Sequence, residues 1–577
     1  GTLIISGTGD MWDWSWNNEL WYNTSESIKT VIIQNGVTSI GDSVFRCCRS
    51  LTSVTIPNSV TSIGNSAFYD CESLTSINIP NGVTSIGESA FGDCKSLASI
   101  TIPNGVTFIG DNAFLWCNKL TDINIDEENP YFYSKDGLIV KKSNNELIAI
   151  AGALSGKIII PEGVKNLKKR VFSYNENITS ISIPASLTNL NTENPNYPEE
   201  VLFAGCTNLT SVEVDKKNPI YSSYNNVIYD KNKTKLIRCS EGYSGDVVIP
   251  NTVKSIDAWA FAYCKKVNSI NVPNTVDNIG EYAFCGCRKI TKINIPSKLT
   301  SISNGLFDNC KGLTNVVLPK GINSIGENAF YYCSSLERID LPMGLKTIGD
   351  SAFYNCSFLK ELIIPEGVTS IGYYACCGCT SLEKITLPKS LTRIGGKQFG
   401  DCKNLKYISY GGTMADWDRL YENGEGQYGF PDGCVVQCSD GSYYDDYAPI
   451  TGITLSTPTN TIFVGSKVRI IATCTPYSAT YKRIVWSSSN NAIATVDANG
   501  YVTGKSAGTV TITARTSNGL TASCNVNVSS STIQNTSGSV LNYNKFRYSF
   551  GNNANSFGYS SDYRIPVERY RQTGLAP

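Results

Sequence analysis

The sequence predicts an α/β solenoid built from 23-residue repeats, followed by an all-β sandwich. The first observation behind this prediction is a proline that recurs every 23 residues, at Pro57 and Pro80 and again from Pro250 to Pro388. A fixed period of this length is typical of solenoids, whose units bury their apolar faces only by stacking on one another. The second observation is that the period ends before Ile450, where segments rich in Thr, Ser and Val begin.

Residues 51–71 show the pattern of one repeat, and its first half predicts a strand. Val54 and Ile56 alternate with small polar residues, and this alternation is typical of a short, half-buried strand. The strand is expected to end at Pro57, because proline has no N–H group to donate to a sheet.

The second half of each repeat is predicted to form a short helical turn. Ala67, Phe68 and Cys71 are spaced so that they share one face of a helix, which would pack inward. The Ile-Gly step before them, at Gly64 here, recurs with the same period and is interpreted as a turn element. Each rung is therefore expected to consist of a strand, a turn and a helical turn.

Two columns of side chains are predicted to fill the interior of the solenoid. A phenylalanine recurs at one repeat position, and it is expected to stack in the core and not to bind a cofactor. Many of the 21 cysteines share another position, which favours buried thiols over disulfides. The phenylalanines are Phe45, Phe68, Phe91, Phe114, Phe172, Phe203, Phe261, Phe284, Phe307, Phe330, Phe353 and Phe399. The cysteines are Cys48, Cys71, Cys94, Cys117, Cys206, Cys264, Cys287, Cys310, Cys333, Cys356, Cys379 and Cys402.

Two variant repeats are predicted to carry β-hairpins. Residues 129–139 replace a normal repeat with Asn-Pro-Tyr-Phe-Tyr-Ser-Lys-Asp-Gly-Leu-Ile, and a close copy starts at Asn218. The dipeptides 136–137 (Asp-Gly) and 225–226 (Asn-Asn) lie between strand-like runs and favour tight turns. Residues 191–199 are a further insertion and are predicted to form a loop.

The repeat Leu-x-x-Ile-x-Ile-Pro-x-x-Val-x-x-Ile-Gly-x-x-Ala-Phe-x-x-Cys resembles the BspA-like class of bacterial leucine-rich repeats over about residues 28–412. The resemblance implies a horseshoe or elongated leucine-rich repeat solenoid that is secreted or displayed on a bacterial surface and is associated with adhesion. Under this interpretation residues 1–30 form an N-terminal cap, and residues 31–447 form the solenoid with its C-terminal cap.

Both ends of the solenoid are expected to be capped, because a terminal repeat faces water on one side. At the N-terminus, Trp12, Trp14, Trp16 and Trp21 are interpreted as apolar cover, with stacking on carbohydrate rings as the alternative. At the C-terminus, residues 410–441 resemble the closing segment of the same family.

Residues 450–529 are predicted to form an antiparallel β-sandwich, because short alternating runs recur at suitable spacing. The segments 485–490, 494–502 and 507–512 resemble the bacterial Ig-like group 2 domain, which commonly serves as a spacer or stalk. The predicted fold class is thus an α/β leucine-rich repeat solenoid followed by an all-β Ig-like sandwich. Residues 530–577 lack an apolar pattern and are interpreted as a linker or the truncated start of a further domain. The expected strands are Ile453–Leu455, Val468–Ile470, Ile484–Trp486, Ala494–Val496, Val510–Ile512 and Val526–Val528.

The composition argues against several classes of chemistry. The chain has no histidine, which excludes His-dependent catalytic triads and imidazole metal sites within it. It has 49 basic and 49 acidic residues, a balance that argues against nucleic acid as the main partner. No apolar run of about 18 residues exists, so no membrane insertion is expected. We predict no catalytic residue, no cofactor and no metal.

Two cysteine pairs and one basic cluster have no predicted function. Cys434 with Cys438, and Cys474 with Cys524, are either disulfides or thiols, and the sequence does not decide between these states. The densest basic cluster lies within residues 165–170 and is interpreted as solvated surface.

The predicted function is non-catalytic extracellular recognition or adhesion, with a host or matrix protein or glycan as the macromolecular ligand. The alternative is a targeting module of a larger secreted enzyme whose catalytic domain lies beyond residue 577. The chain is expected to be secreted or on the bacterial cell surface, and its oligomeric state is left open. Residues between the core positions of each strand point out of the sheet, and in the C-terminal half they are larger and charged or aromatic. The predicted ligand-binding residues are Arg338, Asp340, Glu361, Lys384 and Tyr407.

Overall fold

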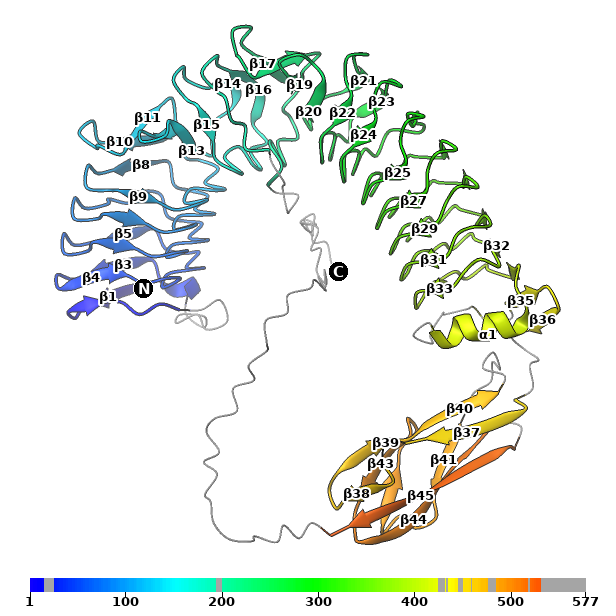
Figure 1. The fold of residues 1–577 in the computed structure, drawn as a ribbon. Helices are drawn as coiled ribbons and strands as arrows, with labels where there is room; N and C mark the ends of the chain where they lie inside the picture. The colour runs from blue at the N-terminus through cyan, green and yellow to red at the C-terminus, as the bar shows by residue number, and fades with distance from the viewer. Residues whose placement is uncertain are drawn as a thin grey trace, which may run out of the picture. The chain divides into compact units, whose positions relative to one another are not determined.

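The first part of the chain winds into stacked rungs that follow one another in chain order, from blue to yellow in Figure 1. The computed structural model describes residues 1–14, 25–192, 200–423, 431, 434–444, 450–457, 459–475, 484–516 and 519–530. A regular rung has two short strands: strand A, which precedes the proline, and strand B, which precedes the glycine of the Ile-Gly step. Equivalent strands of successive rungs pair in parallel, as Ser301 does with Ser324.

The A strands lie where the repeats predict a strand, except that the repeats around Asn78 and Asn294 have only an isolated bridge at that place. They are β1 (Thr2–Ile5), β3 (Thr30–Ile33), β5 (Ser53–Thr55), β8 (Ser99–Ile102), β10 (Asp122–Ile125), β14 (Gly156–Ile159), β16 (Ile178–Ile183), β17 (Ser211–Val214), β21 (Gly245–Val248), β23 (Val267–Asn271), β26 (Asn315–Val317), β28 (Arg338–Asp340), β30 (Glu361–Ile363), β32 (Lys384–Leu387), β34 (Tyr407–Tyr410) and β35 (Val435–Cys438).

The B strands are an element that the sequence does not predict, because most have two residues, too few to show an alternation. They are β2 (Gly9–Asp10), β4 (Val37–Ile40), β6 (Ser62–Ile63), β7 (Ser85–Ile86), β9 (Phe108–Ile109), β15 (Asn166–Leu167), β22 (Ser255–Ile256), β24 (Asn278–Ile279), β25 (Ser301–Ile302), β27 (Ser324–Ile325), β29 (Thr347–Ile348), β31 (Ser370–Ile371) and β33 (Arg393–Ile394).

The predicted helical turn is wrong. Ser66 and Asp70, on either side of Phe68, have φ of 53° and 61°, whereas an α-helix needs φ near about −63°. The N–H of Phe68 donates to Ala90 O of the next rung at 2.8 Å, and not to a carbonyl four residues back. The described residues are therefore nearly all strand and turn, and "α/β" is an imprecise fold class.

The glycine of the Ile-Gly step lets neighbouring rungs approach closely and is not a turn element that needs positive φ. A Cβ on Gly87 would lie 2.5 Å from Gly64 C, and a Cβ on Gly349 would lie 2.5 Å from Glu327 N. Neither Gly87 nor Gly349 has a positive φ. Steric exclusion by the preceding rung, and not left-handed backbone, thus accounts for glycine at these positions.

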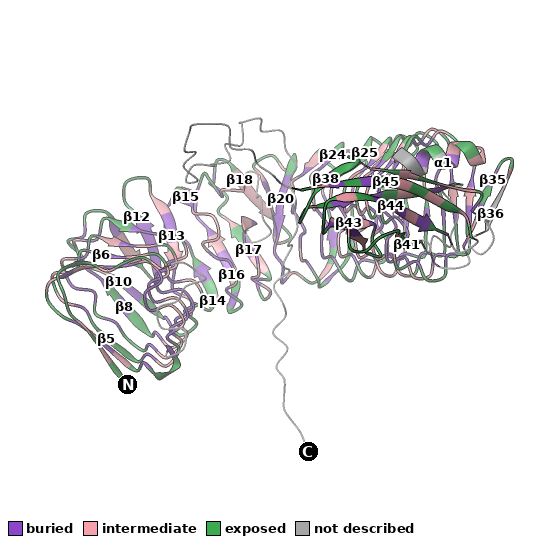
Figure 2. Ribbon diagram, turned by 90° about the horizontal axis from the view of Figure 1, so that it is seen from below, coloured by how far each residue is buried: buried purple, intermediate pink, exposed green. Residues whose placement is uncertain are grey.

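The predicted phenylalanine column is confirmed. Phe261, Phe284, Phe307, Phe330 and Phe353 are fully buried, and their successive ring centroids lie 5.4–5.7 Å apart in stacked pairs. Buried residues, purple in Figure 2, alternate with exposed ones along the strands of the solenoid. The interior is therefore a packed core that runs through the stack.

The predicted cysteine column consists of buried thiols, and the structure adds a hydrogen bond that the sequence does not reveal. In nine rungs the thiol donates to a phenylalanine carbonyl of the preceding rung, as Cys333 Sγ does to Phe307 O at 3.1 Å. Burial raises the pKa of the Cys117 thiol to about 12, so it stays protonated and is a poor nucleophile or metal ligand. The two cysteine pairs that the sequence left open, Cys434 with Cys438 and Cys474 with Cys524, are also free thiols in the structure.

Both predicted hairpins are confirmed. Their turns, residues 136–137 and 225–226, have positive φ at both central positions, which matches the twist of the flanking antiparallel strands. A third strand follows in each case and pairs in parallel with a B strand, β15 or β22. The six strands are β11 (Phe132–Lys135), β12 (Leu138–Lys141), β13 (Glu146–Ile150), β18 (Tyr221–Tyr224), β19 (Val227–Asp230) and β20 (Lys235–Cys239).

A buried asparagine, Asn129 or Asn218, anchors each hairpin to the preceding rung. Its Nδ2 donates to two carbonyls of that rung, and its Oδ1 accepts from two N–H groups of its own loop, so its amide is fully used. The sequence reveals this role only through the Asn-Pro dipeptide common to both copies. The partners of Asn218 are Pro184 O (2.9 Å), Leu187 O (2.7 Å), Ile220 N (3.0 Å) and Tyr221 N (2.8 Å).

The last rung is followed by α1 (Met414–Asn423), the one α-helix among the described residues. Thr413 caps its N-terminus: Thr413 Oγ1 accepts the Asp416 N–H at 3.1 Å, and Asp416 Oδ2 accepts the Thr413 N–H at 3.0 Å. Trp417 is buried against Tyr410, with ring centroids 5.3 Å apart. The remaining elements of this part are the 3-10 turn η1 (Ser25–Ser27) and β36 (Gly441–Tyr444), antiparallel to β35.

The N-terminal tryptophans only partly match the prediction of an apolar cover. Trp14 packs against the core, but Trp12 is 83% exposed, so burial is wrong for Trp12. Trp16 and Trp21 lie outside the described residues, as does most of the predicted loop at 191–199 and the segment after residue 530.

Within the described part of residues 450–529, short strands form three sheets. Each of the six predicted strands is present, and three more, β38, β40 and β43, are not predicted. The pairing is mostly antiparallel, but β38 and β45 are parallel, so the sandwich is not purely antiparallel. The strands are β37 (Gly452–Ser456), β38 (Thr461–Phe463), β39 (Lys467–Arg469), β40 (Ile471–Thr475), β41 (Val485–Ser488), β42 (Ala494–Val496), β43 (Tyr501–Gly504), β44 (Gly508–Arg515) and β45 (Thr521–Ser529).

Candidate functional site

The five predicted ligand-binding residues lie on one exposed face of consecutive A strands. Arg338 and Asp340 are the outward residues of β28, and Glu361, Lys384 and Tyr407 are the first residues of β30, β32 and β34. Lys384 lies in register between Glu361 and Tyr407, so these side chains form a column across neighbouring strands. All five side chains are exposed.

Four of these five residues pair with each other. The Nη2 of Arg338 lies 2.8 Å from Asp340 Oδ1, and the Nζ of Lys384 lies 3.5 Å from Glu361 Oε1. The four side chains are half to three-quarters exposed. Exposed ion pairs contribute only about 0–1 kcal/mol, so a ligand can replace either partner at little cost.

A groove of about 670 Å³ continues this face toward the N-terminus. It forms where the rung at residues 292–295 lacks a full A strand, leaving β23 and β26 in separate sheets. An isolated bridge between Asn294 and Val317 joins this rung to β26, and Asn294 Nδ2 donates to Val272 O at 3.3 Å on the other side. The volume lies within the range of about 300–1,000 Å³ that ligand sites typically have.

Amide side chains dominate the polar lining of the groove. The groove adjoins the five predicted residues, because Asn315, which lines the groove, is the register partner of Arg338 on the neighbouring strand. An amide can donate and accept hydrogen bonds, which suits sugar hydroxyls and peptide groups alike. Sequence reasoning missed the groove because it considered charged and aromatic residues and not outward amides. The lining amides are Asn271, Asn274, Asn294 and Asn315.

We call the groove and the five predicted residues together the A face. Within the described ranges, no group of three or more His, Cys, Asp or Glu side chains is placed to hold a metal ion. A helix both long and apolar enough to cross a bilayer is also absent from the part of the chain that the structure describes.

Family models match both parts of the chain. The model described as "BspA type Leucine rich repeat region" matches residues 15–135, 154–242, 239–358 and 300–419. The model described as "Bacterial Ig-like domain (group 2)" matches residues 449–526. A repeat solenoid joined to an Ig-like domain supports a protein-interaction or adhesion module.

Individual relatives are similar over limited lengths. The "Ig-like virion protein" of Serratia phage KSP90 is 49% identical over 82 residues, which are 14% of this chain and 32% of the virion protein. The chain thus spans about a third of that relative, and 9% of an uncharacterized protein of Clostridium acetobutylicum that is 41% identical over 86 residues, 15% of this chain.

Solved structures of leucine-rich repeat proteins are also similar. One from Eubacterium ventriosum is 27% identical, with a TM-score of 0.39, over 66% of this chain and 90% of that protein. A leucine rich cell surface protein from Faecalibacterium prausnitzii is 25% identical, with a TM-score of 0.39, over 73% of this chain and 90% of that protein.

Proposed function

This chain belongs to the BspA-type leucine-rich repeat family, and from that premise we propose that it is a non-catalytic extracellular recognition or adhesion protein. Its ligand is a macromolecule, a protein or a glycan of a host or matrix, and its location is outside the bacterial cell, secreted or on the surface. The Ig-like domain serves as a spacer.

The observation that carries this proposal is the extent of the A face, which spans three successive short sheets. Successive strands of a sheet lie about 4.8 Å apart, so the face extends about 30 Å over the seven rungs between Ser269 and Tyr407. Its groove presents amides that can hydrogen-bond in both senses, and its ion pairs are exposed and easily exchanged. A long surface of this kind, which also exposes the apolar side chain of Val317, suits a polymer better than a small metabolite.

The proposal is tested by replacing the five predicted residues of the A face with alanine together. Binding of the purified chain is measured on a glycan array and on immobilised matrix proteins. The five-residue variant should lose at least tenfold in affinity for any ligand that the native chain binds, because the ion pairs and Tyr407 then no longer contact it. The replaced residues are Arg338, Asp340, Glu361, Lys384 and Tyr407.

A matched control changes four exposed charged residues in turns, Glu162, Glu176, Arg288 and Lys403, to alanine. Both variants leave the net charge of the chain unchanged, so general electrostatic attraction is the same in the two. The control should bind like the native chain. Equal binding by the native chain and the five-residue variant would refute the assignment of the ligand contacts to these residues.

The absence of catalysis is tested separately. The purified chain is incubated with the polysaccharides and proteins that it binds, and the products are analysed for cleavage. Capture without turnover supports the proposal. Reproducible hydrolysis that one Asp or Glu replacement abolishes would overturn it, because two carboxylates suffice for glycoside cleavage.

A further inference from the structure

Several carboxylates that the solenoid buries lie beside a cation of the same molecule. Each of these carboxylate side chains is no more than 24% exposed, and its oxygen lies 2.7–3.2 Å from a lysine or arginine nitrogen. The pairing has a physical reason, because a buried charge without a partner costs much free energy. The pairs are Asp70 with Arg49, Glu200 with Lys169, Glu241 with Arg238 and Asp257 with Lys235.

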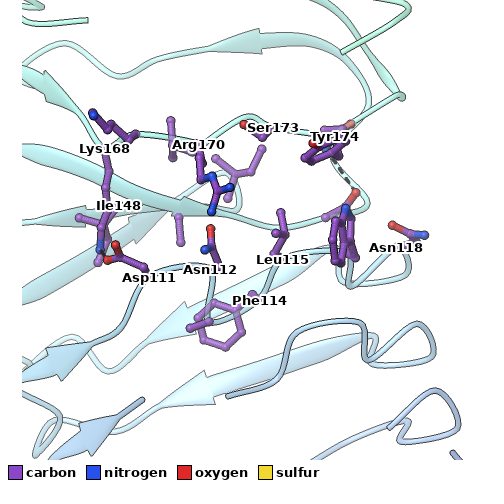
Figure 3. Close-up of a pocket in the computed structure, with 18 residues that line it drawn as sticks. Asp111, Asn112, Phe114, Leu115, Asn118, Ile148, Lys168, Arg170, Ser173 and Tyr174 are labelled. Carbon is purple, nitrogen blue, oxygen red and sulfur yellow. Dashed lines mark hydrogen bonds and ion pairs between the residues drawn. The ribbon is translucent and has the colours of Figure 1, made fainter. Parts of the chain in front are cut away.

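The basic cluster within residues 165–170 is partly used in this way. Lys168, Lys169 and Arg170 line a pocket of about 50 Å³ after the first hairpin (Figure 3). Lys168 forms an ion pair with Asp111, and Lys169 forms one with Glu200 at 3.1 Å. The cluster that the sequence predicts to be solvated surface is thus only partly exposed, and two of its lysines pair with carboxylates of the molecule.

Asp308 is a partly buried carboxylate without such a cation. It follows Phe307 in the turn of its rung, and within the part of the chain that the structure describes its carboxylate has no hydrogen bond and no ion pair. Burial alone therefore raises the pKa of Asp308, to about 7, because no partner stabilises the charged form. The neighbouring Asn309 also has a buried Oδ1 that accepts no hydrogen bond. The fold thus leaves acceptor oxygens on this turn without a donor.

The following rung places an aromatic ring next to this carboxylate. Tyr331 occupies the repeat position of Asp308, directly after the phenylalanine, and Tyr331 O accepts the Asn309 N–H at 2.7 Å. Tyr354, one rung further on, stacks on the Tyr331 ring with a centroid distance of 4.9 Å, and Tyr332 meets that ring at 68° and 4.7 Å. Because Tyr354 lies on the side of the following rung, the other face of the Tyr331 ring is turned toward the rung of Asp308. Among the described residues no ring stacks on that face, since Asp308 has none.

Another part of the solenoid shows which group suits such a place. Arg46 and Tyr69 hold the repeat positions of Asp308 and Tyr331, and the Cζ atom of Arg46 lies 5.5 Å from the centroid of the Tyr69 ring. A cation at this distance is attracted by the negative face of the ring. Next to Tyr331 the chain has a carboxylate in place of the arginine, so the described residues supply no cation for this ring. Two similar pairs of the solenoid are Arg393 with Tyr373 at 5.7 Å and Lys397 with Tyr374 at 5.8 Å.

We propose that Asp308 and Tyr331 together bind an organic cation, the ammonium or guanidinium group of a ligand. The carboxylate accepts a charge-assisted hydrogen bond from the cation, and the free face of the ring attracts it. A divalent metal ion does not fit, because it takes about six or more ligands. Within the described ranges, no group of three or more His, Cys, Asp or Glu side chains is placed to hold one. The cation belongs either to a lysine or arginine side chain of a protein partner or to a free small amine.

Propylammonium is the probe, because it carries an ammonium group on a short apolar chain that can contact the ring. Its binding to the full chain is followed by ligand-observed NMR at pH 8, with propan-1-ol as a neutral probe of similar shape. We expect saturable binding of propylammonium and at least fivefold weaker binding of propan-1-ol. Equal binding of both probes, or no saturable propylammonium signal, would overturn the proposal, since the site would then not select a cation.

The affinity for propylammonium should rise between pH 6 and pH 8. A carboxyl group with a pKa of about 7 is mostly protonated at pH 6 and mostly ionised at pH 8, whereas an alkylammonium stays charged. The titratable groups near Asp308 are Tyr263, Cys285, Tyr331 and Cys333, and burial raises the pKa of each above this range, so none of them changes charge. No charged side chain contributes to the pKa of Asp308 itself. We expect at least threefold tighter binding at pH 8 than at pH 6, and an affinity that does not rise would count against the proposal.

Three variants and a control locate the site. Asp308→Asn removes the charge and keeps the shape, so it should weaken propylammonium binding at least fivefold and abolish its pH dependence. Asp277→Asn changes an exposed aspartate of another rung and should bind like the native chain. Tyr331→Leu should weaken binding at least threefold, whereas Tyr331→Phe, which keeps the ring, should bind like the native chain. Binding that Asp308→Asn leaves unchanged would refute the assignment, and native binding by Tyr331→Leu would refute the contribution of the ring.

Capped tripeptides separate the two sources of the cation. A peptide with a central lysine competes with propylammonium, and one with a central glutamine does not, if side chains of a protein partner can enter. Failure of the lysine peptide to compete leaves a free small amine as the source. These tests involve no residue of the A face, so their failure leaves the proposed function untouched.

Discussion

Replacing Phe307 with alanine should remove a central support of the solenoid core. The ring of Phe307 is fully buried and stacks on Phe284 and Phe330, at centroid distances of 5.7 and 5.4 Å. Truncating a buried phenylalanine to alanine costs about 3–5 kcal/mol through lost burial and the cavity left behind. Each aromatic contact adds about 0.5–1.5 kcal/mol, and two are lost here. We therefore expect the free energy of unfolding to fall by an amount near the top of the range of about 3–5 kcal/mol.

The loss should be local, because each rung of a solenoid contacts only its neighbours. Amide hydrogen exchange should accelerate in the rungs of Phe284, Phe307 and Phe330 and stay unchanged around Phe68. The control is Ser301→Ala, at an exposed position of β25, which should change the free energy of unfolding by less than about 0.5 kcal/mol. Equal denaturant midpoints for the two variants would show that the inside of the solenoid is wrongly assigned.

Two further predictions concern backbone approach and buried charge. Gly349→Ala should destabilise the chain by about 1–3 kcal/mol, because the new Cβ would lie 2.5 Å from Glu327 N. The control Gly344→Ala should be nearly neutral, because the atom nearest to its Cβ is 3.4 Å away. Equal urea midpoints for the two variants would contradict this prediction. Burial raises the pKa of Asp308 to about 7 from 3.8. The folded chain thus keeps a proton that the unfolded chain releases, and the stability from this group is lost as pH rises from 3.8 through about 7. Asp308→Asn should flatten this part of a thermal unfolding profile and exceed the native stability at pH 8, and identical profiles would refute it.

The sequence predicted the features that a periodic pattern displays directly. Alternation located the A strands, and a fixed spacing placed the phenylalanine and cysteine columns in the core. The turn after the Ile-Gly step could not be predicted in this way, because the spacing of Ala67, Phe68 and Cys71 fits a helix as well as it fits the observed turn. The structure replaces that helix with left-handed residues such as Ser66, whose N–H donates to Glu88 O in the next rung at 2.7 Å. Hydrogen bonds between rungs outweigh the local helical preference.

For the candidate site, the sequence could place Arg338 and Tyr407 on the exposed face, because successive residues of a strand point to opposite sides. It could not show the groove, since that depends on whether the rung at residues 292–295 completes its strand pairing with both neighbours. This pairing depends on how residues 23 positions apart contact each other after the rungs stack, and the type of each residue does not reveal it.

The sequence by itself determined that the chain stacks repeats, which side chains face the core, and where two hairpins interrupt the period. Each of these follows from residue type and spacing within one or two repeats. Only the tertiary structure decided that a small pocket opens beside Ala149 and Gly152, after the first hairpin, whereas after the second hairpin Arg238 and Glu241 are buried as an ion pair. The physical reason is that a cavity depends on the volume and charge of side chains from neighbouring rungs, which meet only when the rungs are stacked.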